Sequence, residues 1–401
     1  MKKNLLSLLL LLNFTFYSCN ENIVEETDCV ETEIATRSCA LEDIRTPEEA
    51  IQIALEFTNT QSTRSASPSA ATTETITKQH FAPGGIAQNT PRVSSDTILY
   101  LVKGVGDPIL INAHSNGPTI LATFDNNNFS FLDAINDPTP GVQGLIAVLS
   151  PILDEKMQNI QNLNGEYLNG SNLWTNFLPP SYGSSTVIVE PKVQVEWGQW
   201  APFNRYAPAN CPAGCVAIAT AQAFTVTRHT QEFRGIPLNY DNLINVKSVY
   251  DMFTYPNETD TIARFVREIG DAVDMDYGEN GSGAHTSDAI HLFTYGGVMN
   301  LSTSKRSIQN TLQNYHDGIV IISSRTEEDF WGLIPQGTGH CYLVDGFKKS
   351  SNDVGFMHVN YGWGPGFNGY FLENLLAPHF TDDAEYKYPH EWSFYCLYKN
   401  R

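Results

Sequence analysis

The sequence predicts an α+β chain of two halves, each with its own helices and strands. The N-terminal half contains one capped helix and several short apolar runs separated by turn residues, which is typical of a small α+β module. From residue 187 onward, aromatic residues, glycines and four of the seven cysteines accumulate around an alanine-rich helical run and glycine-flanked strands. A length of 401 residues is sufficient for two domains.

Composition excludes several classes of protein. The 44 acidic side chains against 24 basic ones give a formal net charge of -20, which argues against a nucleic-acid partner. Hydrophobic residues make up 41% of the chain, so a sizeable core can form and wholesale disorder is excluded. No apolar run after residue 17 is long enough to cross a bilayer. Seven cysteines are too few for a disulfide scaffold.

Residues 1–18 are predicted to be a targeting segment. Lys2 and Lys3 precede a short apolar run from Leu5 to Tyr17, as in a signal peptide. The following Ser18-Cys19 pair resembles the bacterial lipobox, in which the cysteine thiol is acylated and becomes the new N-terminus. The alternative is an ordinary secretory signal in which Cys19 is incidental.

The acidic residues that follow this cysteine indicate where the protein is located. Glu21, Glu25 and Glu26 resemble the surface-export signal of Bacteroidetes lipoproteins. We therefore expect a secreted protein on the outer membrane or cell surface, held to the membrane only by a lipid at Cys19. Its mature domain would then be free to be released.

The N-terminal half begins with a helix. Thr46, Pro47 and Glu49 have the spacing of a capping box with proline at the first helical position, and the predicted helix ends near Asn59. Residues 60–78 are rich in Ser, Thr and Ala, so we expect a flexible surface loop there.

Further elements complete this half. The sequence predicts strands over 96–102, 108–111 and 119–124, a helix over 144–163, and an accessible boundary over 179–185. No nucleophile and base come together between residues 20 and 180, so this module is predicted to have no chemistry of its own.

The first candidate catalytic residue is Cys215. Gly214 ends a loop and an alanine-rich run follows to about His229, which places the cysteine at a helix N-terminus. The helix dipole and free N–H groups there favour a thiolate. The alternative is a small apolar residue in a core helix. A redox pair with Cys211 has the wrong spacing, and a zinc site lacks two further ligands.

The second candidate is His340, at the predicted start of a strand. A hairpin centred between Ser350 and Ser351 would place it opposite residue 361, give or take one, and so bring Asn360 within reach as the residue that orients a base. Asp345 is five residues along the strand and points to the opposite face. A lone histidine at a strand end is usually structural, but the combination with Asn360 and Cys215 favours catalysis.

Two more residues complete the candidate site. Gln199 lies in a loop upstream of the cysteine, where its amide could form an oxyanion hole with the N–H of Cys215. Trp363 belongs to a glycine-rich aromatic stretch that could shield the Asn360–His340 hydrogen bond from water. Taken alone, Gln199 could equally be a surface residue, and Trp363 part of a β-turn with core aromatics.

At these residues the sequence resembles the streptopain family of papain-like cysteine peptidases, which are secreted as zymogens. The similarity covers about residues 187–401 and rests on five motifs, namely Gln199–Asn204, Gly214–Gln222, Gly339–His340, Val359–Gly364 and Gly369–Phe371. The resemblance implies that Cys215 is the nucleophile, His340 the base, Gln199 the oxyanion donor, and Asn360 and Trp363 supporting residues.

The resemblance also implies a role for each half of the chain. It implies a propeptide over 19–183 that inhibits and assists folding, followed by a papain-like catalytic domain over 184–401. Ile218 departs from the small polar residue usual in the cysteine helix. The glycine-rich loop 278–283 matches one that borders the family's active site, and the family prefers a hydrophobic residue two positions before the cut.

The remaining cysteines and histidines are predicted to be structural. Cys29 and Cys39 could bridge or stay free, and Cys341 and Cys396 occupy core positions. His285 and His291 have no carboxylate cluster near them in sequence. No metal or cofactor is expected.

The function that we expect is therefore a lipid-anchored zymogen of a cysteine endopeptidase, acting on proteins or peptides and inhibited by its own propeptide. One alternative is a cell-wall peptide amidase with the same Cys-His chemistry. Another is a catalytically inactive surface-binding lipoprotein.

Overall fold

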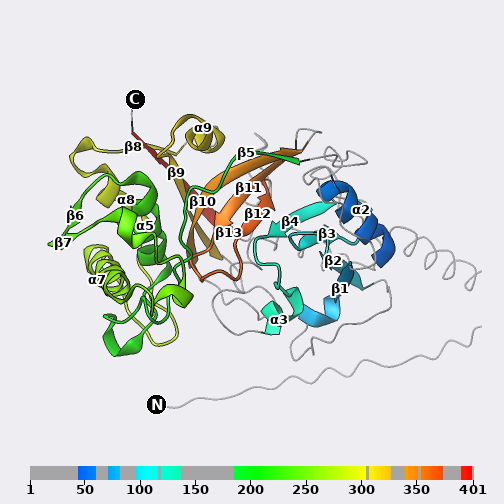
Figure 1. The fold of residues 1–401 in the computed structure, drawn as a ribbon, viewed down its shortest axis with the longest axis horizontal. Coiled ribbons are helices and arrows are strands. Elements are labelled where there is room, and N and C mark those ends of the chain that lie inside the picture. The colour runs from blue at the N-terminus through cyan, green and yellow to red at the C-terminus, as the bar shows by residue number, and fades with distance from the viewer. Residues whose placement is uncertain are drawn as a thin grey trace, which may run out of the picture. The chain divides into compact units, whose positions relative to one another are not determined.

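One sheet continues from the N-terminal half of the chain into the predicted catalytic domain over residues 184–401, hereafter the catalytic half (Figure 1). Its strand order is β1-β2-β3-β4-β12-β11-β10-β9-β13-β8, and β5 pairs with β10 at the side of this path. The computed structural model describes residues 44–59, 71–81, 96–115, 119–136, 185–303, 307–326, 339–350, 354–373 and 390–399. All of these belong to one folded unit, residues 43–401.

Several sequence-based expectations concern residues outside the described ranges. They are the signal peptide over 1–18 with Cys19, the pair Cys29 and Cys39, the helix over 144–163 and the boundary up to residue 184.

The N-terminal half consists of helices packed on a four-stranded meander. Its elements are α2 (Pro47–Asn59), β1 (Thr72–Thr77), η2 (Lys78–Phe81), β2 (Thr97–Lys103), β3 (Ile109–Asn112), β4 (Ile120–Phe124) and α3 (Phe131–Asn136). The capping box is confirmed, since Thr46 N donates to Glu49 Oε2 over 2.7 Å and Glu49 N donates to Thr46 Oγ1 over 3.2 Å. The three predicted strands are also confirmed to within one residue at their ends.

The expectation of a loop over residues 60–78 is wrong for its last part. Thr72–Thr77 forms β1, which pairs with β2 along its whole length. Threonine is β-branched and suits a strand, Ile76 is fully buried, and Glu74 forms an ion pair with Lys103 on β2. The polar composition concealed a strand whose partner lies in a later segment.

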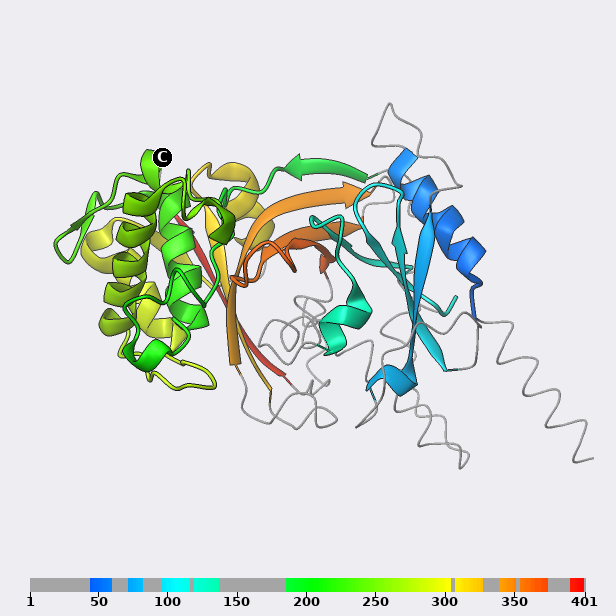
Figure 2. The ribbon, with the colours of Figure 1, turned by 60° about the horizontal axis from the view of Figure 1, so that its bottom comes forward.

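The catalytic half places a group of helices beside the strands β8–β13 (Figure 2). Its helices are η5 (Pro208–Asn210), α5 (Cys215–Thr227), α6 (Tyr240–Leu243), η6 (Val249–Asp251), α7 (Pro256–Ala272), α8 (Thr286–Thr294), η7 (Tyr295–Gly297) and α9 (Ser307–Asn314). Its strands are β5 (Ser185–Val189), β6 (Glu232–Phe233), β7 (Ile236–Pro237), β8 (Asn300–Ser302), β9 (Ile319–Thr326), β10 (Gly339–Ser350), β11 (Gly355–Asn360), β12 (Gly369–Leu372) and β13 (His390–Tyr398).

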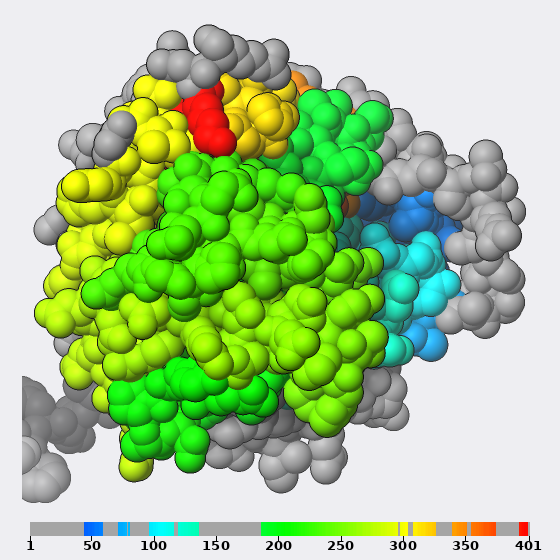
Figure 3. Space-filling view, turned by 60° about the vertical axis from the view of Figure 1, so that its left-hand side comes forward, coloured from blue at the N-terminus to red at the C-terminus, as the bar shows by residue number. Residues whose placement is uncertain are grey.

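The segment between β5 and β8, coloured green to yellow, makes up most of the face seen in Figure 3. Among the helices of the described residues, none combines the length and the apolar character that a bilayer span requires.

Strand β10 separates two hydrophobic cores. Tyr342 and Val344 belong to a core shared with α2, β1–β4, β11 and β12, whereas Cys341 and Leu343 belong to a core shared with α5, α7 and α8. Successive side chains of a strand point to opposite faces, so this alternation is expected. The N-terminal half therefore packs on one face of β10 and the cysteine helix packs on the other.

Candidate active site

Cys215 is the first residue of α5, as the sequence predicts. Gly214 before it has φ +89°, and a Cβ there would lie 2.7 Å from the thioether of Met275 and 3.3 Å from the carbonyl oxygen of Ser282. Glycine is therefore required at this turn. The contact with Ser282 also places the predicted glycine-rich loop beside the start of the cysteine helix.

The thiol of Cys215 is less acidic than the sequence suggests. Burial raises the pKa of Cys215, and this effect outweighs the opposing hydrogen bonds from the main chain of Cys341, Val216 and Cys215 itself. The expectation that the helix N-terminus lowers the pKa is therefore wrong for this structure. Desolvation disfavours the thiolate more than the amides favour it.

His340 is the second residue of β10, but the hairpin register differs from the predicted one. Asn360 pairs with Leu343, so the continued ladder places His340 opposite residue 363 and not opposite residue 361. Lys349 pairs with Gly355, so the hairpin is centred on residue 352 and not between Ser350 and Ser351. A bulge in β10 adds one residue on that strand and offsets only part of this difference. Neither the centre of the turn nor the bulge has a signal in the sequence pattern.

The imidazole of His340 lies in an aromatic stack. Its ring centroid is 4.1 Å from that of Trp363, with 21° between the planes, and 5.7 Å from that of Tyr342. Its Nε2 lies 2.9 Å from the main-chain oxygen of Tyr361. Since a carbonyl oxygen only accepts hydrogen bonds, Nε2 carries the proton and Nδ1 keeps a lone pair.

Burial also controls the charge of this histidine. It lowers the pKa of His340 to about 3, although the hydrogen bond to Tyr361 opposes the shift. At neutral pH the residue is a neutral imidazole, and Cys215 is a neutral thiol. The predicted pair is thus present in its uncharged form.

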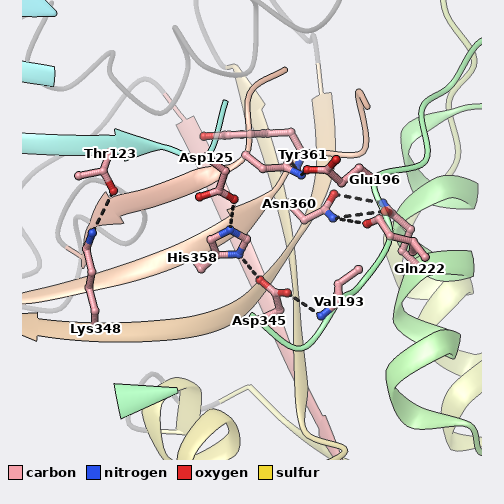
Figure 4. A network of polar contacts seen from close by, with 12 residues as sticks. Thr123, Asp125, Val193, Glu196, Gln222, Asp345, Lys348, His358, Asn360 and Tyr361 are labelled. Atoms are coloured by element: carbon pink, nitrogen blue, oxygen red, sulfur yellow. Dashed lines mark hydrogen bonds and ion pairs between the residues drawn. The ribbon is translucent and has the colours of Figure 1, made fainter. Parts of the chain in front are cut away.

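Asn360 does not orient His340, which corrects the expected role. Its Oδ1 accepts from Gly362 N over 3.0 Å, and its Nδ2 donates to Val195 O over 2.9 Å. The same amide exchanges hydrogen bonds of 3.2 and 3.3 Å with Gln222 of α5 (Figure 4). Asn360 therefore joins the end of β11 to the cysteine helix and to the segment before the Gln199 loop.

Gln222 is the supporting residue to which the sequence analysis gave no role. It is fully buried and seven residues after Cys215, hence on the same face of α5. Besides Asn360, it binds the loop segment, because its Oε1 accepts from Trp197 N over 3.2 Å. A glutamine inside an otherwise apolar helix was the available signal, since such a group requires buried partners.

The Gln199 loop lies next to both Cys215 and Trp363. Gln199 is buried, and its main-chain oxygen accepts from Ala213 N over 2.8 Å, two residues before the cysteine. A Cβ at Gly198 would lie 3.3 Å from Gly364 N, so this loop packs directly on the turn that follows Trp363. The oxyanion role of the Gln199 amide stays a prediction.

Asp345 and Cys341 occupy the places that the sequence predicts. Asp345 points away from His340, as predicted, because its Oδ1 lies 2.6 Å from His358 Nδ1 and its Oδ2 accepts from Val193 N. Cys341 is buried, as expected for a core position, and burial raises its pKa. Within the described ranges, no three His, Cys, Asp or Glu side chains are grouped to hold a metal ion.

A cysteine at a helix start, a neutral histidine on the strand beside it and a glutamine loop together define the site of a papain-like cysteine peptidase. Residues 197–371 match the model of the Peptidase C10 family. This part of the chain is therefore similar to the streptopain-type cysteine peptidases.

The curated relatives that match do so at low identity. Streptopain of Streptococcus pyogenes is 22% identical over 245 residues, which cover 50% of this chain and 61% of that protein. The thiol protease/hemagglutinin PrtT of Porphyromonas gingivalis is 24% identical over 207 residues, 45% of this chain and 23% of that protein. The chain thus matches less than two thirds of the length of either relative.

A solved structure supports the fold across both halves. A fragment of Prevotella intermedia prointerpain A superposes with a TM-score of 0.51 at 18% identity, covering 81% of this chain and 98% of that one. The predicted α+β class is confirmed.

Proposed function

We propose that this chain is the zymogen of a secreted cysteine endopeptidase that hydrolyses peptide bonds in proteins. The observation that carries the proposal is the placement of Cys215 at the start of α5, with main-chain N–H groups directed at its sulfur and with His340 held in one tautomer by Tyr361. The match to the Peptidase C10 family over the same residues supports it.

The chemistry follows from these groups. His340 Nδ1 takes the proton of the Cys215 thiol, and the sulfur attacks the scissile carbonyl carbon to form a tetrahedral intermediate. The N–H of Cys215 and the amide of Gln199 would hold the oxyanion. His340 then protonates the leaving amine, and water attacks the acyl-enzyme, which releases the acid and restores the thiol.

The N-terminal half, predicted as the propeptide over 19–183, would keep the enzyme latent. In the intact chain, thiol and imidazole are both neutral, since burial raises one pKa and lowers the other. The thiolate is the nucleophile, so a neutral pair attacks peptide bonds slowly. We infer that removal of the propeptide lets the two groups ionise as a pair.

The test is the intact mass of purified residues 20–401 over time under reducing conditions, beside Cys215→Ala. Loss of the segment up to the predicted boundary near residue 183 in the unmodified chain only would support a self-processing peptidase. If neither chain is cut, and the unmodified chain digests neither casein nor peptidoglycan, the proposal is wrong. Digestion of peptidoglycan but not casein would indicate the cell-wall amidase instead.

We further propose that the protein is exported and anchored by a lipid at Cys19. The support is the charged and apolar leader, the Ser18-Cys19 pair and the acidic residues after it. Metabolic labelling with a radioactive fatty acid should mark the full-length chain and leave Cys19→Ser unmarked. Equal labelling of both chains would contradict the anchor.

A further inference from the structure

The N-terminal half adds its strands to an edge of the catalytic half. Strand β4 pairs antiparallel with β12, with Gly369 opposite Phe124 and Tyr370 opposite Thr123. Asp125 N continues the ladder by donating to Asn368 O over 3.0 Å. The contact between the two halves is therefore main-chain hydrogen bonding along an otherwise open strand edge, which is a known mode of peptide recognition.

Gly369 is what lets the two strands approach. A Cβ at this position would lie 2.9 Å from the Cα of Phe124 and still closer to the carbonyl of Thr123, and its three nearest atoms all belong to these two residues. A side chain there would collide with the N-terminal half. Gly366, in the turn just before β12, would have nothing within 4 Å of an added Cβ and needs no such freedom.

A buried histidine of the catalytic half faces the same strand. His358 on β11 is 3% exposed and lies between two carboxylates, with Nδ1 2.6 Å from Asp345 Oδ1 and Nε2 2.8 Å from Asp125 Oδ2 (Figure 4). Asp345 belongs to the catalytic half, whereas Asp125 follows β4. Burial disfavours the imidazolium, but the two carboxylates raise the pKa of His358 to about 10.

A second cation points to the same contact. Lys348 on β10 is 4% exposed, and its Nζ donates to Thr123 Oγ1 on β4 over 2.9 Å. The ammonium also lies 4.3 Å from the ring centroid of Tyr370 and 5.3 Å from that of Phe57 on α2. The catalytic half thus presents two buried cations, and the N-terminal half supplies partners to both.

We propose that the edge of β12, His358 and Lys348 form a docking face that keeps the N-terminal half bound as a separate polypeptide after the connecting segment is cut. Asp125 is the charged anchor of this complex. The inference rests on the proposed zymogen function for the cut itself, but the face is defined by contacts that require no catalysis.

The test uses the full chain with Cys215→Ala and a site-specific protease sequence inserted within residues 137–184. After cutting, the two polypeptides should co-elute in size-exclusion chromatography at pH 7 and micromolar concentration. Asp125→Asn, which keeps the shape but removes the charge, should weaken the complex about tenfold or more. Gly369→Ala should weaken it at least as much by collision with β4.

Two matched controls accompany these variants. Asp133→Asn removes an exposed carboxylate from the N-terminal half, and Gly366→Ala adds a methyl group in the turn before β12, so both should bind like the parent. Circular dichroism of each uncut chain is recorded first. If Gly369→Ala does not fold, the result for Asp125→Asn decides.

Separation of the parent polypeptides at pH 7, or parental affinity in Asp125→Asn, would overturn the inference. Because the binding is measured in a Cys215→Ala background, it does not depend on peptidase activity. Absence of activity in the unmodified chain would refute the proposed function and leave this result in place.

Discussion

The main-chain oxygen of Tyr361 accepts a 2.9 Å hydrogen bond from His340 Nε2, so a backbone group orients the candidate base. A carbonyl cannot rotate or ionise, and it selects one tautomer of the imidazole. The neighbouring side chain of Asn360 instead binds Gly362 and Val195. Catalytic orientation and structural support are thus divided between two consecutive residues of the same segment.

The first prediction concerns Asn360. Asn360→Ala leaves a buried carbonyl and several N–H groups without partners, and we expect it to lower the free energy of unfolding by about 2–4 kcal/mol. It should leave the pH dependence of Cys215 alkylation unchanged, because Asn360 does not contact His340. Urea denaturation measures the first effect and iodoacetamide kinetics the second. A shifted pH profile at unchanged stability would show that Asn360 orients the base after all.

The second prediction concerns Gln222, which joins the helix of Cys215 to Asn360 and to Trp197. In the processed enzyme, Gln222→Ala should lower kcat about 10- to 100-fold with little change in KM, because the helix and the loop lose their common anchor. Val226→Ala on the same helix is the control and should keep most of the activity. An unchanged kcat in Gln222→Ala would limit this residue to a packing role.

Sequence reasoning located the candidate pair because its signals are local. A glycine before an alanine-rich run indicates a helix start, and glycines before an apolar run indicate a strand, which together placed Cys215 and His340 correctly. The role of Asn360 was missed because the hairpin register depends on the centre of the turn, at residue 352, and on a bulge in β10, neither of which has a signature in residue type. The net shift is two residues, which places residue 363 opposite His340 in place of residue 361.

Contacts between segments far apart in the sequence were the second feature that could not be predicted. Strand β1 looked like a polar loop, and its stability comes from a pairing with β2 that its own residues do not reveal. Likewise, nothing in the sequence around Asp125 predicts a contact with His358, which is 233 residues away in the chain. The fold class could be predicted, whereas the contact between the halves could not.

The third prediction is the pH dependence of the thiol. Because burial raises the pKa of Cys215 in the intact chain, its thiolate fraction at neutral pH is below that of a free cysteine, whose pKa is about 8.5. Alkylation of freshly purified, unprocessed chain, followed on the Cys215 peptide by mass spectrometry, should keep accelerating as the pH rises above about 8.5. Processed enzyme should react fast at neutral pH. An inflection below about pH 7 in the unprocessed chain would contradict this account.

The fourth prediction is the pH range over which the cut halves stay together. Burial opposes ionisation of Asp125, but His358 outweighs it and holds the pKa of this carboxyl below its usual value. The contribution of the Asp125 carboxylate to binding is thus complete above about pH 4 and is lost as the pH falls through the lowered pKa. The pKa of His358 is raised, so its contribution is complete below about pH 6.5 and is lost as the pH rises through about 10.

The dissociation constant of the two halves should therefore be lowest between about pH 4 and pH 6.5. It should rise as the pH falls below this range and as the pH increases through about 10. The other titratable groups near this pair are Lys348, Asp107, Glu196, Asp345 and Tyr370. Asp125→Asn should flatten the acid side of the curve, while Asp133→Asn should retain it. An acid side that persists in Asp125→Asn would assign the effect to another carboxylate.

The last prediction concerns the turn that positions the acceptor for His340. Gly362 has φ +70°, and a Cβ there would lie 3.0 Å from Ile218 Cγ2 on α5. Gly362→Ala should lower the free energy of unfolding by about 1–3 kcal/mol through backbone strain, and steric overlap with α5 adds to this loss. Displacement of Tyr361 should also reduce kcat. Ile218→Ala removes the colliding methyl group, so in the double variant the loss should be smaller than the sum of the two single losses. Urea denaturation of all four chains gives this coupling free energy. A loss in the double variant equal to the sum of the two single losses would mean that the contact with Ile218 does not constrain the turn.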